Sequence, residues 1–248
     1  MRQASFHHAD PAGLETLELF AHAGHFNRWM YDAIAPWCTG ELLEIGSGIG
    51  NMSYFFLEKR TPVVLSDLRT DYCMILERRF GLENEKGIFR IDLSAADPAA
   101  AHPDLYGRFD TVVALNVIEH IEDDGLAIRN CKRLLRPGGR LVVLVPAYQG
   151  LYNQLDIELA HFRRYTKKKI NALLIREGME PLHTRYFNTV GIFGWWFAGS
   201  LQKRKLISTG QLKLYNKLIP LFRLVDKITR HIAGLSVIAV AKNNDLKL

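Results

Sequence analysis

The segment that most constrains the fold is 41–51, where a short apolar run leads into three closely spaced glycines and a helical pattern follows over 52–59. This order is typical of the first strand, loop and helix of an open α/β sheet, in which ligands bind at the carboxyl ends of the strands. Glycine has no Cβ, so the backbone can adopt positive φ and let a ligand lie directly on the peptide groups. The segment therefore predicts a ligand-binding α/β domain.

The glycine spacing separates two classes of ligand. A dinucleotide fingerprint, G-x-G-x-x-G, requires a glycine where Asn51 stands, which disfavours a nicotinamide-dependent dehydrogenase. The pattern E-x-G-x-G-x-G instead resembles the first motif of the class I S-adenosylmethionine-dependent methyltransferases. The resemblance implies that Glu44 lies near the charged amino-acid end of S-adenosyl-L-methionine and that the loop lies beneath the cofactor. The alternative is a plain tight turn, which can have the same glycines. The expected cofactor residues here are Glu44, Gly46, Ser47, Gly48, Gly50 and Asn51.

Three later strands end in polar residues at the positions that this resemblance requires. The buried run 62–67 ends in an acid about 20 residues after the first glycine, where a carboxylate can accept the ribose hydroxyls. The run 88–92 also ends in an acid, which in the family meets the adenine amino group, and the strand 109–115 continues into an asparagine. The expected cofactor residues from these strand ends are Asp67, Leu68, Asp92, Leu93, Asn116 and Val117.

The remaining pattern alternates helices and strands. Helices are expected at 70–80, 95–101, 124–135 and 167–177, and the last two strands at 179–187 and 235–241. In the family the seventh strand runs antiparallel between the fifth and the sixth. We therefore expect a Rossmann-like α/β fold, with a seven-stranded, mostly parallel sheet, helices on both faces and a helical insertion before the last strand.

Length and composition predict one domain. The chain has 248 residues, 48% of them hydrophobic, which is enough for one α/β core. We expect N-terminal lid helices over 1–39, a cofactor-binding core over 40–190 and 234–243, and a basic amphipathic helical insertion over 191–233. In the family such leading helices cover the cofactor pocket, so Asn27 and Arg28 are candidate substrate contacts in the lid.

Cysteine usage and the first residues indicate a cellular compartment. Cys38, Cys73 and Cys131 are widely spaced and form neither a disulfide framework nor a zinc pattern. The first eleven residues are polar, and no run approaches the roughly 18 apolar residues of a membrane span. A cytoplasmic protein is expected, with peripheral contact at the inner face of the membrane as an open alternative.

The exit of the fourth strand, 116–124, contains adjacent metal-ligating residue types. Glu119 and His120 suit several divalent ions, but two adjacent ligands make a poor site and the sequence names no third or fourth. We therefore expect no metal, with His120 at the edge of the substrate cleft. The strand end also lacks the signature motifs of nucleobase amino-group, cytosine-carbon and protein-arginine methylases, which disfavours nucleic acid and protein arginine as targets.

The stretch 145–166 carries the candidate catalytic residues, because it leaves the carboxyl edge of the sheet. Histidine titrates near neutral pH, so His161 is the candidate general base that removes a proton from an attacking hydroxyl. Asp156 could orient His161 or bind substrate, and Tyr148 completes the catalytic set. The alternatives are that His161 is structural and that Arg164 and Tyr165 anchor the helix that follows. Candidate substrate residues are Asn27, Arg28, His120, Tyr152, Arg163, Arg164, Tyr165 and Trp195, with the arginines suited to an anionic group.

The same stretch narrows the resemblance. Its pattern D-x-x-x-x-H-x-R-R-Y is similar to one found in bacterial small-molecule methyltransferases of the broad ubiquinone-biosynthesis-like group. We therefore expect a methyltransferase that uses S-adenosyl-L-methionine and modifies a small-molecule or lipid-like acceptor, at oxygen. Carbon methylation of an activated ring and a non-catalytic, cofactor-binding, membrane-associated protein remain alternatives. The sequence does not indicate the oligomeric state.

The insertion 191–233 accounts for the basic charge of the chain. It contains eight basic residues and one acid, whereas the whole chain carries a net charge of +6. Leucine, valine and isoleucine at 214, 218, 221, 225, 228 and 232 form one helical stripe, opposite Arg223, Lys227 and Arg230, and Pro220 is expected to divide the helix. Beside the aromatic cluster 195–197, such a helix suits a membrane surface or an apolar, anionic substrate tail. The alternatives are a cap whose stripe packs on the sheet and, without a recognised binding module, a nucleic-acid groove.

Overall fold

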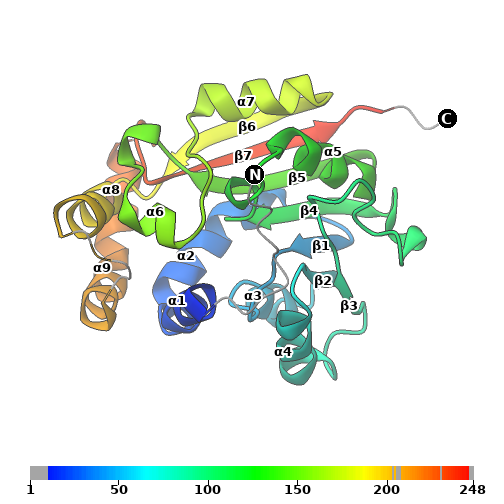
Figure 1. Ribbon diagram of the computed structural model, residues 1–248, viewed down its shortest axis with the longest axis horizontal. Helices are drawn as coiled ribbons and strands as arrows, with labels where there is room; N and C mark the ends of the chain where they lie inside the picture. Colours follow the sequence, from blue (N-terminus) through cyan, green and yellow to red (C-terminus); the bar gives the residue numbers. More distant parts are fainter. Residues whose placement is uncertain (1–10, 203, 205–207, 230, 246–248) are drawn as a thin grey trace.

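The computed structural model describes residues 11–202, 204, 208–229 and 231–245. A seven-stranded sheet with the order β3-β2-β1-β4-β5-β7-β6 forms its centre (Figure 1). The first five strands pair in parallel, and β7 lies antiparallel between β5 and β6. The predicted sheet is confirmed. The strands are β1 Leu42–Ile45, β2 Val63–Asp67, β3 Ile88–Arg90, β4 Phe109–Leu115, β5 Leu135–Pro146, β6 Met179–Phe187 and β7 Ser236–Asn243.

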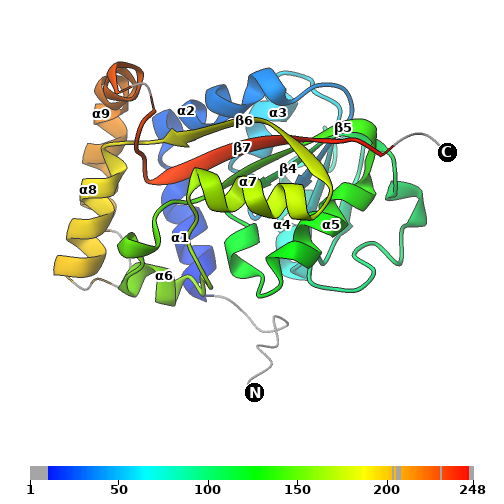
Figure 2. The ribbon, with the colours of Figure 1, turned by 90° about the horizontal axis from the view of Figure 1, so that it is seen from above.

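Helices cover both faces of this sheet (Figure 2). Neighbouring strand residues point to opposite faces, so Val113 lies in one apolar cluster of strand and helix residues while Val112 lies in the other. Both layers are apolar, which explains why the central strands are hydrophobic without alternation. The helices are α1 Pro11–Ala21, α2 Gly24–Ile34, α3 Ser53–Glu58, α4 Thr70–Phe80, α5 Asp124–Leu134, α6 Gln154–Glu158, α7 Lys167–Arg176, α8 Gly191–Trp195 and α9 Thr209–Ile228, with a π-helix at Trp196–Leu201 after α8.

One predicted helix is wrong. Residues 95–101 form turns and bends, and the next short helix is a 3-10 turn at Pro103–Leu105. Pro98 explains the difference, because the residue before a proline is disfavoured in the helical region. The side chain of Asp92 also accepts hydrogen bonds from the backbone N–H and the hydroxyl of Ser94, at 2.8 and 2.6 Å, which favours a turn.

The prediction that Pro220 divides the basic helix is also wrong, because α9 runs through it. A proline inside a helix leaves the carbonyl four residues earlier without its usual N–H donor. Here that carbonyl, on Asn216, accepts a hydrogen bond of 3.2 Å from the Nδ1 of His25, and the Asn216 side chain accepts one of 3.0 Å from the N–H of Phe26. The start of α2 therefore supplies the donor that Pro220 lacks.

The buried face of α9 differs from the stripe identified in the sequence. Ile219 and Phe222 are buried against the sheet layer and Leu212 is also buried, whereas Leu214, Leu221 and Ile228 are 60%, 55% and 70% exposed. The alternative in which the stripe packs on the sheet is therefore wrong. Of the basic residues in the insertion, Lys203, Lys205 and Arg230 lie outside the described residues.

Within the described ranges, none of the helices combines the length and the apolar character needed to cross a membrane.

Candidate active site

The loop after β1 has a backbone that requires glycine. Gly46 has φ of +69°, and a Cβ added there would lie 2.5 Å from Cγ2 of Val117 in the β4 exit. Gly50 has φ of +86°, and its Cβ would clash with the ring of Phe80. The loop can therefore turn tightly against the ends of β1 and β4 only with glycine at these positions.

Glu44 lies beneath this loop. Its side chain is 4% exposed, and its Oε2 accepts a hydrogen bond of 2.6 Å from the hydroxyl of Ser53 at the start of α3. Burial raises the pKa of Glu44 to about 7, although hydrogen bonds from Ser53 and Ser47 oppose the rise. A carboxyl group that changes charge near neutral pH thus lies under the glycine loop.

Asp67 connects β2 to the same loop. Its two carboxylate oxygens accept hydrogen bonds of 2.9 Å from the backbone N–H groups of Gly48 and Arg69. Burial raises the pKa of Asp67 against the effect of these bonds. Asp67 therefore fixes the position of the glycine loop relative to β2.

Helix α1 lies over the loop. The side-chain amide of Asn51 donates a hydrogen bond of 2.9 Å to the carbonyl of Leu17, and a Cβ on Gly48 would lie 2.9 Å from Cδ1 of Leu17. Ser47 is buried and donates to the carbonyl of Glu44 at 3.3 Å. The expected loop residues thus lie together beneath an N-terminal helix.

The other expected cofactor residues follow the ends of β2, β3 and β4, at the same edge of the sheet. Asn116 is exposed with φ of +53°, and Val117 is half-buried against Gly46. Leu68 and Asp92 are half-buried, and Leu93 is buried in the core. Their roles toward a cofactor stay predictions.

The stretch after β5 leaves the sheet edge and returns to it. Ala147 and Tyr165 form a parallel bridge, and the N–H of Tyr165 donates to the carbonyl of Pro146 at 2.8 Å. Tyr148 adopts φ of +60°, and its ring stacks on Tyr186 of β6 at 4.9 Å. Residues 148–164 therefore form a closed loop at the carboxyl edge.

Asp156 is the centre of the polar contacts in this loop. Its Oδ1 accepts hydrogen bonds from Nδ1 of His161 at 2.8 Å and from Nε of Arg164 at 2.7 Å. Its Oδ2 accepts from the N–H of Asn153 at 3.0 Å and from Nε1 of Trp195 at 3.3 Å. Burial alone would raise the pKa of Asp156, but the hydrogen bonds from His161 and Arg164 lower it. A fully buried carboxylate thus holds the imidazole of His161 from one side.

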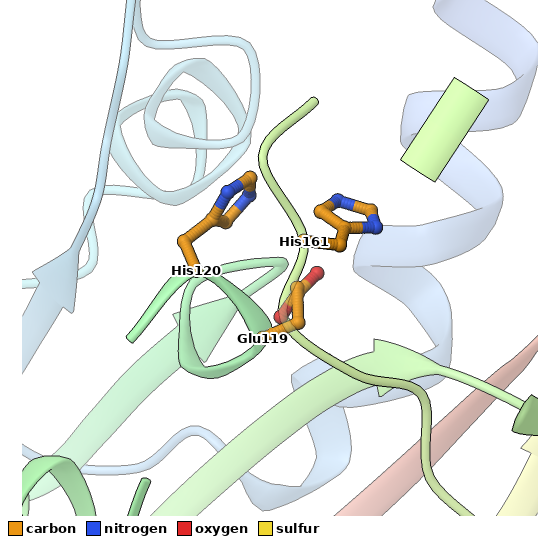
Figure 3. A group of neighbouring side chains, drawn as sticks. All are labelled: Glu119, His120 and His161. Atoms are coloured by element: carbon orange, nitrogen blue, oxygen red, sulfur yellow. The ribbon is translucent and has the colours of Figure 1, made fainter. Parts of the chain in front are cut away.

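Glu119 and His120 lie beside His161 (Figure 3). Both come from a 3-10 turn after β4, and the carbonyl of Glu119 accepts a hydrogen bond of 2.8 Å from the N–H of Phe162. The rings of His120 and His161 have centroids 4.7 Å apart. Burial lowers the pKa of His120 to about 3, and the neighbouring His161 adds to this effect.

The Glu119 carboxylate is unusual in this group. It is fully buried, and neither of its oxygens has a hydrogen-bonding partner within the described part of the chain. Burial raises the pKa of Glu119 to about 7, opposed by His161. One potential ligand atom from each of Glu119, His120 and His161 lies within 4.8 Å of the others, so the fold supplies the third ligand that the sequence could not name.

Several expected substrate residues make contacts within the protein. Arg164 is 2% exposed and donates to the carbonyl of Ala147, while Arg163 pairs with Asp124 at 3.0 Å. Their proposed binding of an anionic group stays a prediction. The hydroxyl of Tyr152 donates to the carbonyl of His161 at 2.6 Å, and Tyr165 donates to Asp124 at 3.0 Å.

The two lid candidates also make internal contacts. Asn27 is buried and donates to the carbonyl of Phe20 at 2.8 Å, which connects α2 to α1. Arg28 pairs with Glu58 of α3 at 2.7 Å, and its guanidinium lies 4.5 Å from the ring centroid of Phe55. Their roles as substrate contacts stay predictions.

Sequence reasoning did not select Glu119 as a site residue, nor Asn153 and Ser53. The Glu-His pair was visible, but its approach to His161 depends on contacts between residues 42 positions apart. Asn153 forms a capping box with Asp156 at the start of α6. The spacing of these two residues in the sequence could have indicated this capping box.

Comparison with known proteins agrees with this architecture. Residues 43–141 match a family described as "Methyltransferase domain". The chain is 32% identical over 112 residues to the ubiquinone biosynthesis O-methyltransferase of Thiobacillus denitrificans, covering 45% of this chain and 46% of the relative. It is 30% identical over 139 residues to the ubiquinone/menaquinone biosynthesis C-methyltransferase of Paracoccus denitrificans, covering 52% of this chain and 54% of the relative. The chain thus spans about half the length of the curated relatives it matches.

A solved structure with the same fold is phosphoethanolamine N-methyltransferase 2 of Haemonchus contortus in complex with S-adenosyl-L-methionine. It has a TM-score of 0.59 at 15% identity, covering 92% of this chain and 57% of that one. The domain match, the homologous methyltransferases and the sheet order support the same assignment. Residues 43–141 are therefore similar in sequence to methyltransferase domains, and the described chain shares the fold of a solved S-adenosylmethionine-dependent methyltransferase.

Proposed function

We propose that the protein transfers a methyl group from S-adenosyl-L-methionine to a hydroxyl of a small-molecule, lipid-like acceptor, with His161 as the general base. The observation that carries this proposal is the hydrogen bond between Asp156 and His161 at the carboxyl edge of the sheet, 2.8 Å long. A buried carboxylate that holds one nitrogen of an imidazole leaves the other nitrogen available for proton transfer.

The residues at the sheet edge fit the cofactor. Gly46 and Gly50 provide a turn in which a Cβ would clash, and Asp67 lies at the end of β2, where a ribose would be bound. Glu44, Ser47, Gly48 and Asn51 would complete the loop side of the site, with Leu68, Asp92, Leu93, Asn116 and Val117 around the nucleoside. When bound, S-adenosyl-L-methionine supplies an electrophilic methyl group.

The protein's own part in the reaction is to position the acceptor and to remove its proton. Because the carboxylate of Asp156 accepts from Nδ1 of His161, that nitrogen carries the hydrogen, and the lone pair lies on Nε2. The Nε2 atom would take the hydroxyl proton of the acceptor, and Asp156 would stabilise the imidazolium that forms. Tyr148 and Tyr152 belong to the same loop and are proposed to orient the acceptor.

The relatives guide the choice of acceptor. One matched relative is named for O-methylation and another for C-methylation in ubiquinone biosynthesis. An acceptor with a hydroxylated aromatic ring and an apolar tail would serve either reaction. Oxygen methylation requires removal of a hydroxyl proton and therefore depends more strongly on His161, so we favour it here.

A second role for the same cluster is supported by Glu119. A buried carboxylate that has no hydrogen-bonding partner among the described residues, beside two imidazoles, has the ligand types of a divalent cation site. In that role His161 would be a ligand instead of a base. The two roles differ in their dependence on metal, which makes them separable by experiment.

We further propose the division of the chain suggested by the sequence, with lid helices over 1–39, a core over 40–190 and 234–243, and an insertion over 191–233. The contact of Leu17 with the glycine loop supports a covering role for α1. Peripheral membrane contact through 195–231 forms part of this proposal.

The experiment that tests the proposal combines binding and turnover. Calorimetric titration with S-adenosyl-L-methionine and S-adenosylhomocysteine on wild type and Asp67→Ala should give micromolar binding that the variant loses. Turnover is then measured with catechols and hydroxylated quinone precursors, and the product is analysed for a methyl ether. Absence of binding to the wild type would overturn the proposal, and a carbon-methylated product would select the alternative reaction.

A further inference from the structure

The end of the molecule formed by α8 and α9 exposes apolar side chains on both elements. Both views place these helices together beyond β6, at the edge of the sheet (Figures 1 and 2). We call this surface the α8/α9 face. It comprises Phe193, Trp196, Phe197 and Leu201 from α8 and the π-helix, and Leu214, Leu218, Leu221, Leu224 and Ile228 from α9, with exposures between 37% and 70%.

This exposure follows from the two apolar sides of α9. The side that carries Ile219 and Phe222 packs into the sheet layer. With about 3.6 residues per turn, Leu214, Leu221 and the other outward residues lie on the opposite side of the helix. Exposed apolar side chains gathered at one end of a molecule mark a site of interaction with a protein or a membrane.

The charge around the face selects the kind of partner. Lys213, Lys217 and Lys227 are exposed on the same helix, and the only acid of the insertion, Asp226, is buried. Asp226 accepts hydrogen bonds of 2.7 Å from the N–H groups of Asn188 and Thr189, so its charge is directed inward. The outward charge is therefore basic, which complements an anionic surface.

A groove beside the outward side of α9 adds to this match. It has a volume of about 400 Å³, with Ile219, Pro220 and Leu224 as its apolar lining. His25, Arg28, Arg223 and Lys227 also line it. The two arginines already pair with Glu58 and Asp32, at 2.7 and 2.9 Å, so Lys227 is the cation of the groove without such a pair within the described ranges.

The inner side of α8 contacts the candidate active site. Trp195 donates to Asp156, and its ring lies 4.7 Å from the guanidinium carbon of Arg164. Its neighbour Trp196 is 49% exposed on the outer side. The exposed face and the His161 loop are therefore separated by a single short helix.

We infer that the α8/α9 face docks on an anionic lipid bilayer, with its apolar residues in the interfacial region and its lysines toward the headgroups. Aromatic residues beside aliphatic and basic ones are characteristic of helices that lie in a membrane interface. The inference rests on the proposed function for the lipid-like character of the acceptor, which docking would bring to the edge of the active site. Nucleic acid would match the basic residues alone, and a second protein would match the apolar residues alone. The presence of both kinds of residue beside an exposed tryptophan favours the bilayer.

Co-sedimentation of the full chain with vesicles tests the inference. The vesicles contain phosphatidylcholine alone or an equimolar mixture with phosphatidylglycerol, at about 50 and about 500 mM salt, because charge attraction is strongest at low salt. Wild type should bind the anionic vesicles at low salt. Leu221→Glu combined with Ile228→Glu should reduce binding by roughly tenfold or more. Lys213→Glu with Lys217→Glu should reduce it by more than about 30-fold, because loss of two basic charges alone accounts for that factor.

A matched control is Ile175→Glu. This side chain is 62% exposed and lies on α7, outside the α8/α9 face, so the change introduces the same charge at a different surface. It should bind as wild type does. Tryptophan emission should shift to the blue on binding, and Trp196→Phe should remove part of that shift. Each variant is checked by circular dichroism, and its turnover of a soluble catechol should stay within about twofold of wild type, because these residues lie outside the His161 loop.

Three results would overturn the inference. The first is no sedimentation of wild type with anionic vesicles at low salt. The second is equal loss of binding in the Ile175 control. The third is the absence of vesicle binding together with another kind of binding. That other binding would be either to an RNA or DNA oligonucleotide, or in a concentration-dependent dimer that Leu221→Glu with Ile228→Glu abolishes. Vesicle binding without turnover would instead contradict the methyltransferase proposal and leave docking intact.

Discussion

Asp156 and His161 are joined twice, through their side chains at 2.8 Å and through a backbone hydrogen bond of 2.9 Å from the N–H of His161 to the carbonyl of Asp156. The second bond fixes the chain between them, so the two side chains start from neighbouring backbone positions. This arrangement allows both residues to be tested with variants that separate the orientation of the ring from its chemistry.

Replacing His161 with Gln should lower kcat by roughly 10² to 10⁴-fold, the range expected when a general base is lost. Binding of S-adenosyl-L-methionine, measured by calorimetry, should change little, because the expected cofactor residues lie on other loops. Asp156→Asn should lower kcat by a smaller factor and alter the pH profile, since the ring loses its anionic partner. His183→Gln is the matched control, because this histidine lies on β6 and stacks on Trp37, outside the His161 loop. A loss below tenfold in His161→Gln, with methylation at carbon, would assign the alternative reaction.

Metal dependence separates the two roles of His161. If His161 is the base, a chelator should leave turnover unchanged, because the Asp156–His161 hydrogen bond does not involve Glu119. The measurement is turnover after chelation, followed by addition of Mg²⁺, Mn²⁺ or Zn²⁺, with calorimetric titration of each ion. Loss of turnover that Mn²⁺ restores, with ion binding that Glu119→Gln abolishes, would assign His161 as a ligand.

Asp226 should be a major determinant of how α9 is attached to the sheet. It is 1% exposed, and both of its oxygens accept hydrogen bonds of 2.7 Å from the backbone at the end of β6. Asp226→Ala leaves two buried N–H groups without acceptors, so we expect a loss of about 2–5 kcal/mol in the free energy of unfolding. Urea denaturation measures this loss. Asp104→Ala, at a side chain that is 67% exposed, should cost less than about 1 kcal/mol and is the control. Equal effects in the two variants would contradict the assignment.

The strands and the glycine loop could be predicted from the sequence because their signals are local. The strand 179–187 and the N-cap Thr166 of α7 coincide with the sequence pattern, since hydrophobic runs and capping residues act over a few positions. Asp156 and His161 are five residues apart, so their proximity was also foreseeable.

The remaining features depend on residues that are distant in the sequence. The continuity of α9 through Pro220 depends on His25, which lies 191 positions from the Asn216 carbonyl it contacts. The burial of Asp226 depends on N–H groups about 38 positions away. An apolar stripe at helical spacing does not show which side of a helix faces the core when both sides are apolar, so the outward position of Leu221 needed the structure.

Glu44 should make stability depend on pH in a direction opposite to that of a typical paired carboxylate. Burial raises its pKa from 4.5 to about 7 in the folded protein, so the folded state holds a proton that the unfolded state releases between these values. The stability contributed by neutral Glu44 is present below the unfolded pKa and is lost as pH rises through about 7.

The substitution Glu44→Gln removes this titration while keeping a neutral side chain that can bond to the hydroxyl of Ser53. Relative to wild type, the variant should therefore gain stability as pH rises from 5 to 8, by an amount on the order of 1–3 kcal/mol. Urea denaturation of wild type, Glu44→Gln and the exposed control Glu83→Gln at both pH values measures the difference. Other groups that titrate in this range are present in all three proteins, so their effects cancel in the comparison. Parallel pH dependence in wild type and Glu44→Gln would mean that the carboxylate beneath the glycine loop is already ionised in the folded protein, stabilised by contacts other than Ser53.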